Sequence, residues 1–80
     1  MDAKELRKRL TEVFRDVFDD DSIVITADTT ADDIEDWDSI EHITLIGAGE
    51  DEFRMKFKMG EVAGMNNVGE MMKIIAARGK

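Results

Sequence analysis

Three short sequence patterns mark places where a helix is expected to begin. In each of them an Asp or Asn is followed three residues later by a Glu, namely Asp2 and Glu5, Asp38 and Glu41, and Asn67 and Glu70. An Asp or Asn just before a helix can accept a hydrogen bond from the free N–H groups of the first turn, and a Glu three residues later is typical of the capping box. The chain is therefore predicted to be helical.

Apolar residues at helical spacing follow these patterns. In the first segment they are Leu6, Leu10, Val13, Phe14, Val17 and Phe18, and in the last they are Val68, Met71, Met72 and Ile75. The first helix is predicted to end at Asp19-Asp20-Asp21, because negative charge is unfavourable beside the C-terminal end of a helix. The second is predicted over residues 39–53, with an inward side of Ile43, Ile46, Gly47 and Phe53 and an outward side of Glu41, Glu50 and Asp51.

The loop over residues 21–37 is long for a compact domain. Thr30 and Asp33 can cap one short turn within it. Three isoleucines are expected to anchor the loop on the core, Ile23, Ile25 and Ile34.

The remaining segment is interpreted as a connector and a short helix. Residues 54–59 alternate charged and apolar side chains, and Phe57 is expected to plug the core from an extended connector, before a short helix over residues 60–65. Eighty residues allow a single domain, residues 1–80, with one small core. The predicted fold is all-α, a small four-helix bundle with a long first loop and a short third helix.

Charge is distributed unevenly along the chain. Residues 19–53 hold 13 of the 19 Asp and Glu and no Lys or Arg, whereas the rest of the chain holds 6 acids against 11 basic residues. Such an acidic surface repels nucleic acid and anionic membranes and favours binding to basic protein surfaces. The alternative is that the acidic run is only a solvent-exposed loop with no binding role. The chain contains no cysteine and no apolar run long enough to span a bilayer. The absence of cysteine fits an intracellular protein, and the expectation is a cytoplasmic monomer without stable membrane insertion.

Ser39 falls on the first helical position after the Asp38 cap, where it is expected to be exposed. A phosphate group is well tolerated there, because free N–H groups and the positive end of the helix dipole lie nearby. Trp37-Asp38-Ser39-Ile40 closely resembles the Asp-Ser-Leu signature of acyl carrier proteins, with Ile in place of Leu. The acidic loop and second helix, and Asn66-Asn67-Val68 at the family's customary distance, extend the resemblance over nearly the whole chain. Gly49, in place of a large apolar residue, and the basic residues 54–58 depart from the family pattern.

The resemblance implies a carrier that catalyses nothing itself. Ser39 would be modified with 4′-phosphopantetheine from coenzyme A by a phosphopantetheinyl transferase, beside the Asp38 cap, which would make the chain a phosphoprotein. Acyl intermediates of fatty-acid, polyketide or related specialised synthesis would be held on that arm as thioesters. Acyl-transferring or condensing enzymes with basic patches would then bind the acidic residues Asp38, Glu41, Glu50 and Asp51. An aminoacyl or peptidyl carrier and an unmodified acidic helical adaptor are the alternatives.

Gly47 and Gly49 lie in the second helix, where each costs about 1 kcal/mol relative to Ala. One explanation is that bulky neighbours fill the space beside them, such as Phe57, Met65, Met71 and Met72. The other is a groove that opens for an acyl chain. The candidate groove residues are Ile46, Gly47, Gly49, Met65 and Met71.

Two other kinds of site fit the sequence less well. His42 stands three residues after Ser39, but a nucleophilic pair also needs an orienting third group and an oxyanion hole, so His42 is interpreted as a surface histidine. The acids from Asp19 onward lack the Gly and Glu positions of a calcium-binding loop, and the methionines at 65, 71 and 72 are interpreted as core residues. No metal site is predicted.

Overall fold

Four helices and one short 3₁₀ turn make up the fold of residues 2–80, which the computed structural model describes. The helices are α1 (Ala3–Phe18), α2 (Ser39–Phe53), α3 (Met59–Ala63) and α4 (Val68–Arg78), and the turn is η1 (Ala31–Asp33). Residues 2–80 contain no strand, and none of their helices is long and apolar enough to cross a bilayer. The all-α prediction is confirmed, although α3 begins one residue and ends two residues earlier than predicted.

The predicted cap residues each accept a hydrogen bond at the start of a helix. Asp2 accepts from the N–H of Glu5 (2.7 Å), Asp38 from that of Glu41 (2.9 Å) and Asn67 from that of Glu70 (2.9 Å). The capping box predicted at α2 is only half formed, because the N–H of Asp38 donates to the carbonyl oxygen of Asp36 (3.0 Å). The Asp38 side chain therefore fixes the start of α2, one residue before Ser39.

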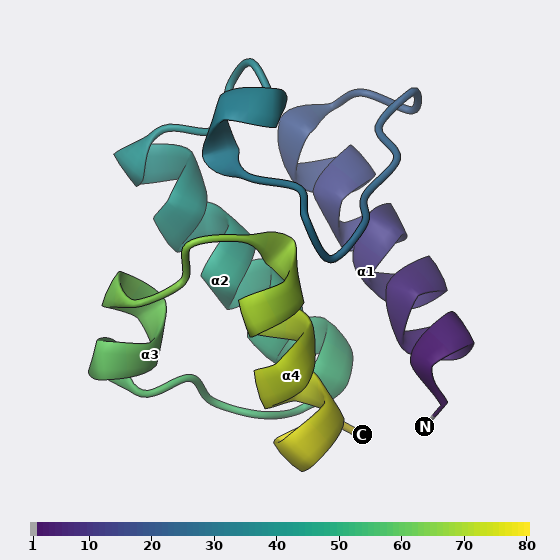
Figure 1. Ribbon diagram of the computed structural model, residues 1–80, viewed down its shortest axis with the longest axis vertical. Coiled ribbons are helices and arrows are strands. Elements are labelled where there is room, and N and C mark those ends of the chain that lie inside the picture. Colours follow the sequence, from purple (N-terminus) through teal and green to yellow (C-terminus); the bar gives the residue numbers. More distant parts are fainter. Residues whose placement is uncertain (1) are drawn as a thin grey trace.

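One hydrophobic core lies between α1, α2 and α4, and the long loop passes over it beside α1 (Figure 1). The predicted loop anchors are buried, and Phe57 is half-buried against the core, as expected. The buried apolar residues are Leu6, Leu10, Val13, Phe14, Phe18, Ile23, Ile25, Ile34, Leu45, Ile46, Phe53, Met55, Val68, Met71 and Ile75.

Backbone hydrogen bonds fasten the long loop to the start of α4. The N–H of Val68 donates to the carbonyl oxygen of Thr29 (2.8 Å), and the N–H of Gly69 donates to that of Ala27 (2.9 Å). The first N–H groups of a helix have no partner within it, so the loop satisfies two of them. The loop is thereby held in place as it leads through η1 to the start of α2.

The inward side of α2 differs from the prediction at two positions. Ile43 is 71% exposed and Gly47 is also exposed, whereas Ile46 and Phe53 are buried as predicted. The side that meets the core also includes Leu45 and Gly49. Apolar residues occupy most of the circumference of α2, so their spacing fits more than one face. Packing against the other helices decides which face is buried.

Candidate functional site

Ser39 lies exposed at the first position of α2, as predicted. The preceding residue, Asp38, is also exposed and uses its carboxylate as the cap. A hydroxyl on this exposed residue is accessible to solvent and lies at the positive end of the helix dipole. A separate enzyme could therefore reach the Ser39 oxygen, and a phosphate ester formed there would be favoured by the backbone dipoles.

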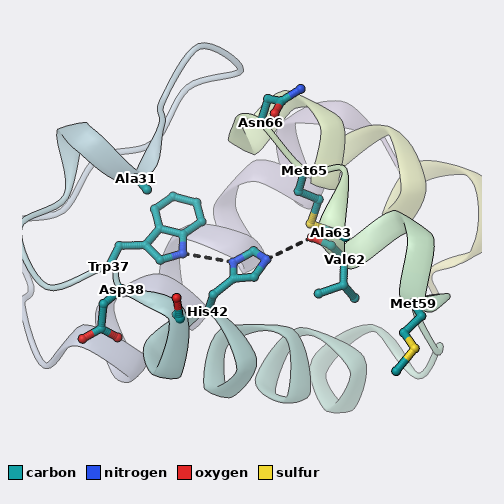
Figure 2. A pocket seen from close by; sticks show the side chains of 10 residues that line it. Ala31, Trp37, Asp38, His42, Met59, Val62, Ala63, Met65 and Asn66 are labelled. Atoms are coloured by element: carbon teal, nitrogen blue, oxygen red, sulfur yellow. Dashed lines mark hydrogen bonds between the residues drawn. The ribbon is translucent and has the colours of Figure 1, made fainter.

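An open pocket adjoins Ser39 between η1, the start of α2 and α3 (Figure 2). Most of its surface is apolar, with side chains of Trp37, Val62 and Met65 among those that form it. The complete lining is Ala31, Trp37, Asp38, Ser39, His42, Met59, Val62, Ala63, Met65 and Asn66. The pocket could receive an apolar group attached near Ser39.

Trp37, His42 and Val62 form a hydrogen-bonded row across this pocket (Figure 2). The indole Nε1–H of Trp37 donates to Nδ1 of His42 (3.1 Å), so the neutral imidazole carries its proton on Nε2. That nitrogen donates to the carbonyl oxygen of Val62 in α3 (3.3 Å). The two rings are stacked with their centroids 5.8 Å apart, and Phe14 contacts the indole edge-on at 5.4 Å. The row thus joins the loop, α2 and α3.

The interpretation of His42 as a surface residue is wrong. Its side chain is half-buried, and both ring nitrogens are occupied by Trp37 and Val62. The imidazole is therefore placed as a structural tie and not as a base for Ser39. Sequence reasoning missed this contact because the carbonyl partner lies 20 residues further along the chain, in α3.

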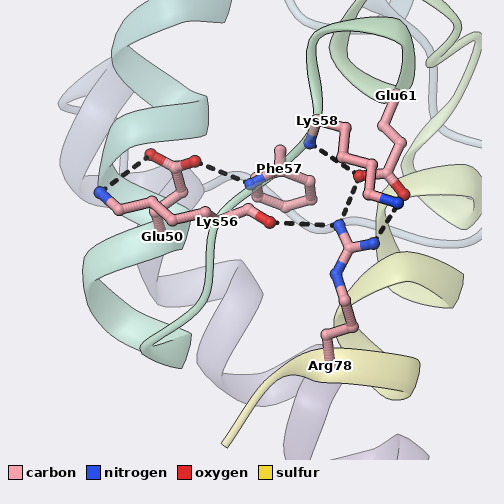
Figure 3. Close-up of polar contacts among 6 residues, drawn as sticks. All are labelled: Glu50, Lys56, Phe57, Lys58, Glu61 and Arg78. Carbon is pink, nitrogen blue, oxygen red and sulfur yellow. Dashed lines mark hydrogen bonds and ion pairs between the residues drawn. The ribbon is translucent and has the colours of Figure 1, made fainter.

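Three of the four acids assigned to partner binding lie where a partner could reach them. Asp38 and Asp51 are exposed, and Glu41 is partly exposed. The prediction that Glu50 faces outward is wrong, because only 18% of its side chain is exposed. Its carboxylate accepts the N–H of Phe57 (2.8 Å) and lies 3.8 Å from the Lys56 ammonium (Figure 3). Glu50 therefore fixes the connector after α2.

The space beside Gly49 is filled by neighbouring side chains. A Cβ atom added there would lie 3.1 Å from Cε of Met71 and 3.8 Å from Cε2 of Phe57. This matches the first explanation for the glycines, in which bulky neighbours occupy the space. Gly47 lies outside the core with nothing within 4 Å of an added Cβ, so its assignment to an acyl groove is wrong.

The other predicted groove residues are divided between the core and the pocket. Ile46 and Met71 are buried in the core, whereas Met65 is half-buried and lines the pocket beside Ser39. The groove residues therefore do not form one continuous cavity. No group of three or more His, Asp or Glu is placed to hold a metal ion within the part of the chain that the structure describes.

Polar contacts from α4 hold α3, which contributes no buried residue (Figure 3). The Arg78 guanidinium, in the last turn of α4, binds both carboxylate oxygens of Glu61. It also donates to the carbonyl oxygen of Lys56 (3.2 Å). The N–H of Lys58 donates to Glu61 as well (2.8 Å), so these contacts join the connector, α3 and α4.

The Glu61 contacts predict a specific loss of stability in acid. Hydrogen bonds from Arg78, and next from the Lys58 N–H, lower the pKa of Glu61 from its ordinary value of 4.5 to about 2. Because the folded-state pKa lies below the unfolded one, this stabilisation is complete above about pH 4.5 and is lost as the pH falls toward 2. From about pH 5 to about pH 3, the urea midpoint of the wild type should fall more than that of Glu61→Gln. Equal falls would contradict this assignment.

Comparison with solved structures identifies a similar protein. A solution NMR structure of a holo acyl carrier protein from Geobacter metallireducens is 42% identical to this chain and superposes with a TM-score of 0.86. The match covers 91% of this chain and 84% of that protein. No protein-family model and no curated protein matches the chain.

Proposed function

The chain belongs to the acyl carrier protein family, and from that premise we propose that it carries acyl groups as thioesters on a 4′-phosphopantetheine arm attached to Ser39. The observation that carries this proposal is the position of Ser39, exposed at the start of α2 beside an open and mostly apolar pocket. Fatty-acid, polyketide or related specialised synthesis is the proposed setting. The carrier presents its acyl group, and partner enzymes carry out the chemistry.

The residues around Ser39 fit such an arm. In the attachment step the Ser39 oxygen would form a bond to the pantetheine-bearing phosphorus in the diphosphate of coenzyme A. The bond from that phosphorus to the bridging oxygen would break, adenosine 3′,5′-bisphosphate would leave, and the serine proton would pass to the transferase. The arm supplies a thiol for thioester formation. Asp36 and Asp38 are exposed acids near the attachment point, so they would repel a phosphodiester rather than hold it. Their proposed role is therefore to attract basic residues of partner enzymes.

The attachment site can be tested by mass. After incubation with coenzyme A and a broad-specificity phosphopantetheinyl transferase, the wild type should gain the mass of one phosphopantetheinyl group. Ser39→Ala should gain nothing. Ser22→Ala is the matched control, because Ser22 is also exposed but its hydroxyl donates to Asp20 (2.6 Å), and this variant should be modified like the wild type. An arm on Ser39→Ala would show that the attachment site is elsewhere.

The acidic surface predicts salt-dependent binding to a transferase. Each exposed charge pair contributes about 0–1 kcal/mol to binding. Reversing two acids together should therefore lower the kcat/KM of the transferase for this carrier roughly tenfold at low salt. The variant is Glu41→Lys with Asp51→Lys. Glu5→Lys with Glu12→Lys makes the same change in net charge at exposed positions of α1 and should lower kcat/KM much less.

The decisive measurement is the transferase's kcat/KM for the Glu41/Asp51 double variant divided by that for the Glu5/Glu12 double variant, across a series of salt concentrations. The ratio should approach one as salt rises, because screening weakens interactions between exposed charges. If both double variants lose the same activity at low salt, net charge alone explains the effect and the proposed surface is incorrect.

A further inference from the structure

The residues that line the pocket beside Ser39 also separate it from the hydrophobic core. Trp37, Val62 and Met65 line the pocket, and the same three residues pack against the buried core residues. His42 lies between Trp37 and Val62 and is hydrogen-bonded to both (Figure 2). An acyl chain attached near Ser39 could enter the core at this point only if the row of Trp37, His42 and Val62 parted.

The core has no space ready for an acyl chain beside Gly49. Met71 and Phe57 already occupy that region, and protein interiors hold few voids. Arg78 also holds Glu61 of α3 and the carbonyl oxygen of Lys56 in the preceding connector, so a movement of α3 away from His42 would strain these contacts too. Entry therefore has to replace existing contacts.

We propose that His42 determines which acyl groups this carrier can take into its core. This inference rests on the proposed function. Short acyl groups stay in the open pocket beside Ser39, because burying so few methylene groups cannot offset the lost contacts of the Trp37–His42–Val62 row. Short acyl groups are then the class that this carrier keeps accessible at its surface. Longer chains would open the row and be shielded.

The chain length at which an acyl group can enter the core follows from comparing the contacts of the row with the burial of methylene groups. Each of the two hydrogen bonds contributes a factor of roughly 2 to 13 to the closed state, and the stacked rings a similar factor. Burying one methylene group contributes about a fourfold factor. Breaking the whole row is thus offset by roughly two to six buried methylene groups. An acetyl group falls below this range and an octanoyl group reaches its upper end.

Thermal melting of a series of loaded proteins tests the proposal. The wild type would be loaded from acetyl-, butyryl-, hexanoyl- and octanoyl-coenzyme A, with intact mass confirming each product. A group that enters the core stabilises the folded state, so the measured quantity is the Tm of each acylated form minus that of the arm-only form. In the wild type we expect no rise for acetyl and a rise only at the long end of the series.

Three variants identify the row as the cause. His42→Ala removes both hydrogen bonds and the ring contact, so its Tm should begin to rise at a shorter acyl chain than that of the wild type. For the hexanoyl form, the rise in Tm should exceed the wild-type rise by about 4 °C or more. Trp37→Phe keeps an aromatic ring but removes one donor, and it should give an intermediate onset even if His42→Ala folds poorly. Thr44→Ala changes an exposed residue of α2 and should match the wild type.

The proposal would be overturned if the Tm of the wild type already rose with an acetyl group. It would also be overturned if the Tm rise began at the same chain length in the wild type and the variants, or if no protein showed a rise at any length. An unchanged mass after loading would instead contradict the attachment of the arm, so failure of the proposed function is distinguishable from failure of this inference.

Discussion

Replacing Phe14 with alanine is expected to lower the free energy of unfolding by about 3–5 kcal/mol. The Phe14 side chain is fully buried, and its ring lies 5.9 Å from that of Phe18 and 5.4 Å from that of Trp37. A domain of this size has a total stability of roughly 4–12 kcal/mol, so the substitution removes a large share of it. Because Trp37 also binds His42, the loss should extend to the pocket beside Ser39.

Urea unfolding followed by circular dichroism and by the fluorescence of Trp37, the sole tryptophan, measures this effect. Phe14→Leu is the matched control, because it keeps an apolar side chain and leaves a smaller cavity, and it should cost less than half as much as alanine. A loss below about 1 kcal/mol for Phe14→Ala would mean that Phe14 is not packed in the core as described.

Alanine substitutions at two helical glycines should change stability in opposite directions. At Gly69 an added Cβ would lie 2.7 Å from the carbonyl oxygen of Ala27, which accepts the N–H of Gly69. Gly69→Ala should therefore push the loop from α4 and lower the free energy of unfolding by about 1–3 kcal/mol. At Gly47 nothing lies within 4 Å, so Gly47→Ala should raise it by about 1 kcal/mol through helix propensity alone.

The two variants control each other, since both replace glycine with alanine inside a helix. Urea midpoints with unchanged slopes would report the two stabilities directly. If Gly69→Ala proved as stabilising as Gly47→Ala, the close approach between the long loop and α4 would be wrong.

Local signals made much of the fold predictable. The starts of α1, α2 and α4 depend on an Asp or Asn side chain and an N–H three residues later, and both are visible in the sequence. The position of Ser39 followed from the same local rule, because the Asp38 cap places it on the first turn of α2. Helical spacing also identified most of the core residues of α1 and α4.

Contacts between distant parts of the chain were not predictable in this way. The inward assignment of Ile43 was wrong because α2 is apolar around most of its circumference, so burial depends on the other helices. Glu50 turns inward because the Phe57 N–H needs an acceptor, and His42 does so because Trp37 and Val62 flank it. Each of these side chains has polar groups that could equally well face water, so only the folded arrangement determines their partners.

The carrier role is tested most simply by the intact mass of this protein purified from the cells that make it, measured before and after treatment with hydroxylamine, which cleaves thioesters. We expect a phosphopantetheinyl group on Ser39, with heavier acylated species that revert to the mass of the arm-bearing form after treatment. A protein whose mass equals that of its amino-acid sequence alone, with no change on treatment, would contradict the carrier role and favour an unmodified adaptor.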